Sequence, residues 1–346
     1  MEAVAGREGE DSPTERARGD RAEAGVLQRV AALACRLTDV DEAVVLLRGR
    51  AHTNSMVAVA WHCRHGGPIP AWRESQAAVR RALETGLPAA ESGRGRRLSA
   101  AAPLMVDGAA RGVLALSSLE ETRPVAPKEL GLLAELAELG SSALIERDLR
   151  ARAEAVLDAG VRMLSRAVDI RDDYTGRHSA QVGDLARRVG SRIGMTAGEL
   201  ELLEYAARLH DVGKLGVPDS ILLKPGPLDE REWEVMRRHP EWGAEMIAQV
   251  PGLEELAQLV VSHHERWDGG GYPGGLAGES IPLASRVICA CDAFEAMVSR
   301  RPYRAPLSVE DALAELVAAS GTQFDPHVVS AVEVEAGSDH WIAGTA

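Results

Sequence analysis

Between about residues 172 and 332, apolar side chains recur three or four positions apart in one segment after another. This spacing gathers them on one face of an α-helix, whereas a half-buried strand alternates every second residue. No strand-like alternation interrupts the series. The predicted helices cover 182–193, 197–209, 229–238, 243–250, 253–264, 283–297 and 309–319. We therefore expect this part of the chain to fold as an all-α domain.

The first half of the chain has a different pattern. Apolar spacing and short β-branched runs predict helices at 26–37 and 75–85 and strands at 43–47, 56–61, 102–106 and 112–117. Asp107 and Gly108 separate the last two strands and are typical of a tight β-hairpin turn. A long helix follows from about Pro127. This half is therefore expected to be an α+β domain with an antiparallel sheet.

The domain boundaries follow from these patterns. We expect a disordered tail at 1–24, an α+β domain at 25–148 and a connecting helix at 149–171. An all-α domain at 172–332 and a C-terminal tail at 333–346 follow. The connecting segment keeps a three-four apolar spacing, which extends the helix that begins near Pro127. Two interpretations stay open: a parallel homodimer seam, or an ordinary amphipathic helix packed on its own domain.

Composition excludes several classes of protein. Lys+Arg 39 against Asp+Glu 52 gives a net charge of −13, so no nucleic acid polymer is expected as a partner. No apolar run approaches the roughly 18 residues that a membrane span needs. The first 24 residues also lack the apolar stretch of a signal peptide, so we expect a cytoplasmic protein. Its cysteines are then expected to stay reduced; they are Cys35, Cys63, Cys289 and Cys291.

Seven candidate metal ligands lie on or beside separate helices of the all-α domain. They are His178, His210, Asp211, His239, His263, His264 and Asp292. Imidazole and carboxylate are the ligands that borderline divalent metals such as Fe, Mn and Zn prefer. A carboxylate can bridge two ions while imidazoles complete each shell, so the set is large enough for a two-metal site.

Two motifs give a specific resemblance. Residues 210–214 read HDVGK and match the pattern HDxGK, and residues 263–273 read HHERWDGGGYP and match HHExxDGxGYP. Together they resemble the HD-GYP phosphodiesterases, a branch of the HD metal-dependent phosphohydrolases. The first half of the chain is similar to a small GAF-type sensory domain. The resemblance implies hydrolysis of cyclic di-GMP at an iron- or manganese-containing centre, controlled by an unknown small ligand or signal at the GAF-like domain.

The resemblance also implies roles for individual residues. One divalent ion would be held by His178, His210, Asp211 and Asp292, and a second by His239, His263, His264 and the bridging Asp211. Catalytic roles fall to Asp211 and Lys214. Substrate contacts are expected from Lys214, Gly271, Tyr272, Pro273, Arg301 and Arg304. Some relatives have a glutamate at the position of Tyr174 that helps to bind a third metal, so we expect a binuclear centre here.

Three functions are compatible with these residues. The leading one is cleavage of cyclic di-GMP to pGpG, with onward cleavage to GMP as a further step. A second is the same chemistry on another cyclic dinucleotide or nucleotide. A third is a non-catalytic module that binds a dinucleotide or a protein partner. Retention of all seven candidate ligands speaks against the third.

Overall fold

The computed structural model describes residues 13–38, 40–49, 56–64, 77–91, 99–118, 124–172, 177–299 and 305–337, with side chains described from Gly25 onward. The chain divides into two compact units, Met1–Glu154 and Ala155–Ala346. Within the described ranges, no helix is long and apolar enough to cross a membrane.

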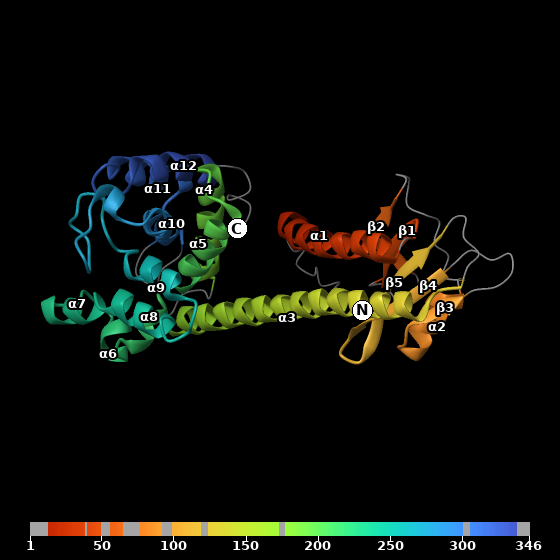
Figure 1. Cartoon of the computed structure of the whole chain (residues 1–346). Helices are drawn as coiled ribbons and strands as arrows, with labels where there is room; N and C mark the ends of the chain where they lie inside the picture. The colour runs from red at the N-terminus through yellow and green to blue at the C-terminus, as the bar shows by residue number, and fades with distance from the viewer. Residues whose placement is uncertain are drawn as a thin grey trace, which may run out of the picture. The chain divides into compact units, whose positions relative to one another are not determined.

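The first unit is built on a five-stranded antiparallel sheet with the strand order β2-β1-β5-β4-β3 (Figure 1). The strands are β1 (Glu42–Arg48), β2 (Met56–Cys63), β3 (Ala89–Glu91), β4 (Ser99–Val106) and β5 (Ala109–Ser117). The helices are α1 (Pro13–Thr38), α2 (Ala77–Thr85) and the first part of α3 (Pro127–Arg171). The antiparallel α+β fold predicted for this half is confirmed.

Both faces of this sheet are covered. Along β1, Ala43 and Val45 pack with α1 and α3, while Val44 and Leu46 pack with α2 on the opposite face. Successive side chains of a strand point to opposite faces, so a strand buried on both sides reads as a continuous apolar run. The strands of this sheet therefore form continuous apolar runs in the sequence and do not alternate between apolar and polar residues.

The helix and hairpin predictions for this unit are largely confirmed. Asp107 and Gly108 have φ values of 50° and 76° and join β4 to β5. α1 starts at Pro13, well before the predicted start at residue 26. Residues 1–12 of the predicted disordered tail lie outside the described residues. The short strand β3 was not predicted.

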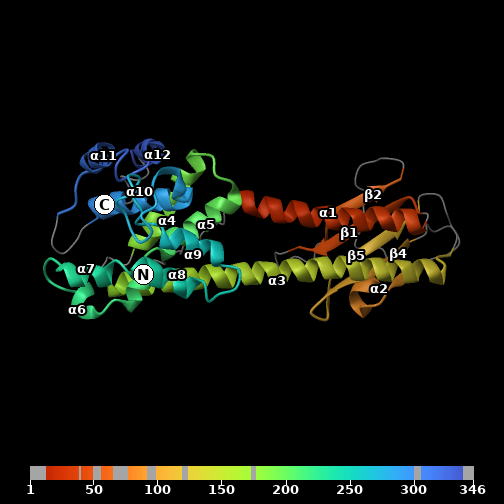
Figure 2. The same cartoon turned by 60° about the vertical axis from the view of Figure 1, so that its left-hand side comes forward.

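The second unit is helical. Its elements after α3 are α4 (His178–Arg192), α5 (Ala197–Leu209), η1 (Val212–Gly216), α6 (Asp219–Leu222), α7 (Glu230–Met236), α8 (His239–Ile247), α9 (Glu254–Val261), η2 (Gly278–Ser280), α10 (Leu283–Val298), α11 (Val309–Ala318) and α12 (Pro326–Ala336). α4 and α5 lie side by side, and α10 packs against both (Figures 1 and 2). The all-α prediction is confirmed.

The core of this unit includes the last part of α3. Val161 and Val168 are 3% exposed and belong to the same apolar cluster as the buried side chains of α4, α5 and α10. Other apolar residues of α3 point outward: Val156, Met163 and Ile170 are 72%, 69% and 65% exposed. The end of α3 is therefore apolar on two sides, one buried and one exposed.

Several helix ends differ from the predictions. α9 ends at Val261, although apolar spacing predicted a helix through His264. Successive helical residues point about 100° apart, so two adjacent histidines within a helix would diverge. Because the helix stops first, His263 and His264 both turn toward the same space. α12 was not predicted, and it continues to Ala336, beyond residue 332.

Candidate metal centre

The first two candidate ligands lie between α5 and η1. His210 follows the last residue of α5 and Asp211 precedes η1, and both side chains are buried. Asp211 Oδ2 is 3.3 Å from Nε2 of His210, and Asp211 Oδ1 is 3.4 Å from Nε2 of His239. The two oxygens of one carboxylate therefore face histidines from two different segments.

A glycine brings these segments together. A Cβ atom at Gly213 would lie 1.9 Å from the carbonyl oxygen of His239 and 2.5 Å from the backbone nitrogen of Gly243. A close-packed interior has no room for a methyl group at such distances. Glycine in the HDxGK motif thus permits the close approach of η1 to α8 and places Asp211 within reach of His239.

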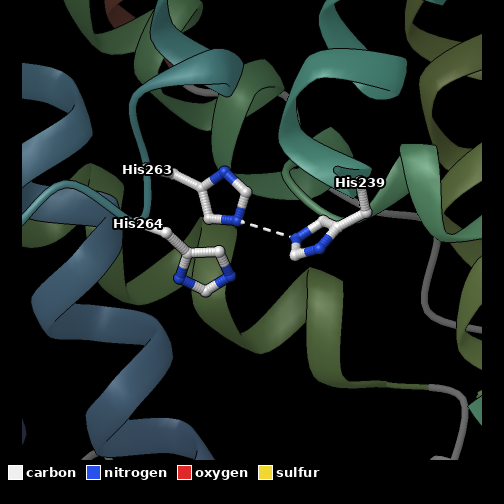
Figure 3. Close-up of side chains that lie close together, drawn as sticks. All are labelled: His239, His263 and His264. Atoms are coloured by element: carbon white, nitrogen blue, oxygen red, sulfur yellow. Dashed lines mark hydrogen bonds between the residues drawn. The ribbon is translucent and has the colours of Figure 1, made fainter. Parts of the chain in front are cut away.

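Three imidazoles form one group. His239 begins α8, and His263 and His264 follow α9. The ring centroids are 5.3 Å apart for His239 and His263, 5.0 Å for His239 and His264, and 4.0 Å for His263 and His264. Figure 3 shows the rings converging, with the Nε2 atoms of His239 and His263 directed toward each other at 3.4 Å.

Backbone carbonyls fix the rings of three histidines. Nδ1 of each lies within hydrogen-bond distance of the carbonyl oxygen three residues earlier: 2.7 Å from His210 to Ala207, 2.8 Å from His239 to Met236 and 2.6 Å from His263 to Val260. A carbonyl oxygen only accepts, so Nδ1 donates its proton to it, and Nε2 is the ring atom left to bind a metal. Metal-binding imidazoles are commonly oriented in this way.

A second group combines imidazoles with carboxylates. His178, the first residue of α4, has its Nε2 atom 3.2 Å from Oδ1 of Asp292 on α10. Nδ1 of His178 is hydrogen-bonded to Oε2 of Glu295, which is buried and also accepts a hydrogen bond from the Ser299 hydroxyl. Glu295 therefore orients His178, a role that the sequence did not reveal. Its position three residues after Asp292 on one helix face is the signal that would have found it.

Asp211 lies between the two groups. The ligand atoms of three sets lie within 4.8 Å of one another: His239 with His263 and His264; His178 with His210 and Asp292; and His210 with Asp211 and His263. All seven predicted ligands are thus brought together. The third set shares one histidine with each of the others, which is the arrangement that a bridging carboxylate requires.

The protonation states of the two groups differ. Burial lowers the pKa of His239 to about 3 and that of His264 to about 4, and burial also puts the pKa of His263 well below its usual range. Burial likewise opposes a charge on His178, but hydrogen bonds to Asp292 and Glu295 outweigh it and raise the pKa of His178 to about 10. The first group is therefore neutral, whereas the carboxylates of the second stabilise a positive charge.

Divalent cations fit this donor set. Nε2 of His210 is buried and has no hydrogen-bond partner among the residues that the structure describes. A buried polar atom without a partner is costly, and a metal ion would satisfy it. The pKa of Asp211 lies well below its usual range because the charges of His210 and Lys214 outweigh the effect of burial, so this carboxylate is ionised. Neutral imidazoles and ionised carboxylates are the forms that bind metal, so a cation that binds beside His178 would displace the extra proton of that ring.

Lys214 is fixed beside the bridging carboxylate. Its Nζ atom lies 2.7 Å from Asp211 Oδ2 and 2.6 Å from Oδ2 of Asp172. Arg171, the last residue of α3, donates hydrogen bonds to the carbonyl oxygens of Lys214 and Val217 at 2.8 and 2.7 Å. The backbone and the ammonium group of Lys214 are therefore both held by the end of α3. Sequence reasoning missed Arg171 and Asp172, since their contacts join segments more than 40 residues apart.

The glycine-rich loop closes one side of the centre. Glu265 accepts hydrogen bonds from the backbone nitrogens of Gly274 and Leu276 at 2.6 and 3.1 Å, so it holds the loop in place. A Cβ at Gly271 would lie 2.3 Å from the backbone nitrogen of Arg266, which gives this glycine a packing role. The Tyr272 ring lies 4.9 Å from that of His264, and Tyr272 precedes Pro273 through a cis peptide bond. Of the other residues predicted to shape the site, Arg301, Arg304 and Tyr174 lie outside the described residues.

Two family models match the chain. Residues 162–328 match the HD domain and residues 24–144 match the GAF domain. The chain combines a GAF domain with an HD domain. The HD assignment agrees with the resemblance given by the two motifs, and the GAF assignment agrees with the pattern of helices and strands in the first half. The candidate metal centre lies wholly within the HD domain.

Relatives of known name match about half of the chain. The chain is 43% identical over 171 residues to "Cyclic di-GMP phosphodiesterase response regulator RpfG" of Xanthomonas campestris, covering 49% of this chain and 45% of that protein. It is 41% identical over 173 residues to "Cyclic di-GMP phosphodiesterase" of Thermotoga maritima, covering 49% and 47%. It is 36% identical over 180 residues to "3'3'-cGAMP-specific phosphodiesterase 2" of Vibrio cholerae, covering 51% and 34%. The chain thus spans about half or less of these relatives' length.

Proposed function

We propose that the HD domain is a metal-dependent phosphodiesterase that opens cyclic di-GMP to pGpG, with onward cleavage to GMP. The observation that carries this proposal is the position of Asp211, whose two oxygens face the two groups of candidate ligands. The names of the relatives from Xanthomonas and Thermotoga support cyclic di-GMP as the substrate.

The candidate ligands and Lys214 would have separate roles in this reaction. His239, His263 and His264 would hold one cation, and His178, His210 and Asp292 the other, with Asp211 contacting both. When bound, two divalent cations lower the pKa of a water molecule and offset the charge of the phosphate. Lys214 would contribute a donor to a phosphate oxygen from a position fixed by Asp211 and Asp172. The resemblance to the HD-GYP phosphodiesterases implies iron or manganese, and nitrogen and oxygen ligands suit both metals, as they also suit zinc.

Replacing the bridging carboxylate tests this function. Asp211→Ala should lower the metal content from about two ions per chain, because it removes the carboxylate that would contact both ions. Formation of pGpG should stop, because the proposed chemistry needs both ions. The assay is anaerobic product analysis with Fe(II) and Mn(II), together with elemental analysis and circular dichroism. Asp184→Asn, a change at an exposed carboxylate that pairs with Arg208, is the control. Full activity of Asp211→Ala, or no cleavage by the metal-loaded natural chain, would refute the proposal.

A relative's name supports a second candidate substrate. The Vibrio relative named for 3'3'-cGAMP suggests that the same chemistry acts on a mixed guanine and adenine dinucleotide. Turnover of cyclic di-GMP and 3'3'-cGAMP measured side by side would decide between them, the preferred substrate having the higher kcat/KM.

The proposal includes sensing by the GAF domain and a parallel homodimer through α3. The GAF domain would bind a small ligand that controls the HD domain. The outward side chains Val156, Met163 and Ile170 are spaced seven residues apart, and this period suits a seam between two identical helices. Met163→Glu should shift the protein from dimer to monomer in sedimentation equilibrium, whereas Arg162→Glu beside it should not. A monomeric natural chain would contradict the dimer.

A further inference from the structure

An exposed aromatic and an arginine lie next to the metal centre. Trp233 on α7 is 45% exposed, and Arg237 follows the last residue of this helix. The guanidinium carbon of Arg237 is 5.9 Å from the ring centroid of Trp233 and 5.7 Å from that of Tyr272. Tyr272 in turn contacts His264. These three side chains form a continuous surface, here called the aromatic shelf, that starts at the candidate metal ligands.

The donors of Arg237 are available to a ligand. In the described part of the chain, no carboxylate or carbonyl oxygen accepts a hydrogen bond from its guanidinium group. Other arginines of this unit are paired: Arg266 binds Asp268, and Arg286 binds Asp325. A guanidinium flanked by two rings keeps its planar set of donors in a fixed orientation. Arg237 is thus a preoriented cation whose side-chain donors are not taken up by the residues that the structure describes.

The geometry suits a purine base. Nucleobases stack on aromatic side chains, and the exposed indole of Trp233 offers such a face. Arginine pairs in a bidentate manner with guanine, which presents the two acceptors O6 and N7 on one edge. Adenine presents an acceptor beside an amino donor, and arginine has donors only. The shelf therefore favours guanine over adenine.

We propose that the aromatic shelf of Trp233, Arg237 and Tyr272 binds one guanine base of the substrate, with Arg237 reading its O6/N7 edge. This inference rests on the proposed function and deepens it, because it places base recognition beside the phosphodiester chemistry. It assigns substrate-binding roles to Trp233 and Arg237, two residues that lie outside the HDxGK and GYP motifs.

The test compares substrates that differ in their bases. The metal-loaded full chain and its Arg237→Ala variant are assayed with cyclic di-GMP, cyclic di-AMP and bis(p-nitrophenyl) phosphate, which has no base. In Arg237→Ala, kcat/KM for cyclic di-GMP should fall by about 10- to 100-fold more than for the other two, mainly through KM. Arg237→Lys should recover only part of the loss, since lysine keeps the charge without the bidentate geometry.

The neighbouring arginine provides a matched control. Arg238 stacks on Trp242, with 4.8 Å between guanidinium carbon and ring centroid, and is not part of the shelf. Arg238→Ala should leave the preference for cyclic di-GMP over cyclic di-AMP unchanged. Equal losses on all three substrates in Arg237→Ala, or full rescue by lysine, would identify a phosphate contact or a structural role and overturn the proposal.

A binding measurement separates the shelf from the catalytic claim. Calorimetric titration with cyclic di-GMP and cyclic di-AMP needs no turnover. If the natural chain binds cyclic di-GMP about tenfold or more tightly than cyclic di-AMP and Arg237→Ala loses this difference, the shelf stands even where no cleavage occurs. If the natural chain binds both equally, or neither, the shelf is refuted while diester hydrolysis can still be observed.

Discussion

Replacing Gly213 with alanine should damage the candidate metal centre through one methyl group. The added Cβ would lie 1.9 Å from the carbonyl oxygen of His239, and Cβ atoms essentially never approach other atoms closer than 3.0 Å. η1 and α8 must therefore separate by about 1 Å, since 3.0 minus 1.9 is 1.1. That movement separates Asp211 from His239, whose side chains are 3.4 Å apart across the same contact.

The expected magnitudes follow from this displacement. A misplacement of about 1 Å in a catalytic site costs on the order of 100-fold in rate. Overpacking costs about 1–3 kcal/mol of the free energy of unfolding. For a unit of this size, the midpoint of thermal unfolding should fall by about 2 to 12 °C. Steady-state kinetics, metal analysis and calorimetry of Gly213→Ala measure these three effects.

Gly198→Ala is the matched control, because a Cβ at Gly198 in α5 meets nothing within 4 Å. It should be neutral or stabilising by up to about 1 kcal/mol, since alanine is the better helix former. If Gly213→Ala keeps its full metal content and turns over within about threefold of the natural chain, the contact between η1 and α8 does not set the geometry of the site.

Two further predictions concern the groups around the centre. Glu295→Gln keeps the shape of the side chain but removes the negative charge that faces Nδ1 of His178. Metal affinity should therefore fall about 10- to 100-fold while the fold stays intact. Unchanged affinity in a metal titration would contradict this prediction. Without metal, stability to urea should be greatest near pH 6.5. It falls below that pH because the unfolded state protonates His239 and His264, whose folded pKa values are about 3 and 4. It falls above pH 6.5 because the pKa of His178 is raised to about 10 in the folded state, and a stability that rose steadily from pH 6.5 to 10 would refute this assignment.

Local patterns predicted most of the helices and picked out the candidate ligands that the fold brings together. Candidates such as His210 and Asp211 stand out because metal binding requires these residue types within a short motif. The seven candidate ligands then meet in space because each lies at a helix end or on an inward helix face. Apolar periodicity also predicted that the helix beginning near Pro127 continues as α3 to Arg171.

Features that depend on tertiary contacts were not predictable in this way. α9 ends at Val261 without a glycine or proline to stop it, and beyond its end Nδ1 of His263 is hydrogen-bonded to the carbonyl oxygen of Val260. Glu295 acts only through a histidine more than 100 residues earlier in the chain. A role for Arg237 could be inferred only from the fold, which places its guanidinium group against the ring of Tyr272. The strand β3 has three residues, which is too short for any periodic pattern.

The hydrogen bonds from Nδ1 to carbonyl oxygens have a consequence for metal exchange. The backbone turns that hold His210, His239 and His263 are made by the fold itself, so the cost of orienting these rings is met before any ion arrives. In small zinc domains, by contrast, the metal must organise the chain that binds it. In the HD domain a cation would meet rings that are already oriented, so it would be able to leave and to bind again without the chain unfolding.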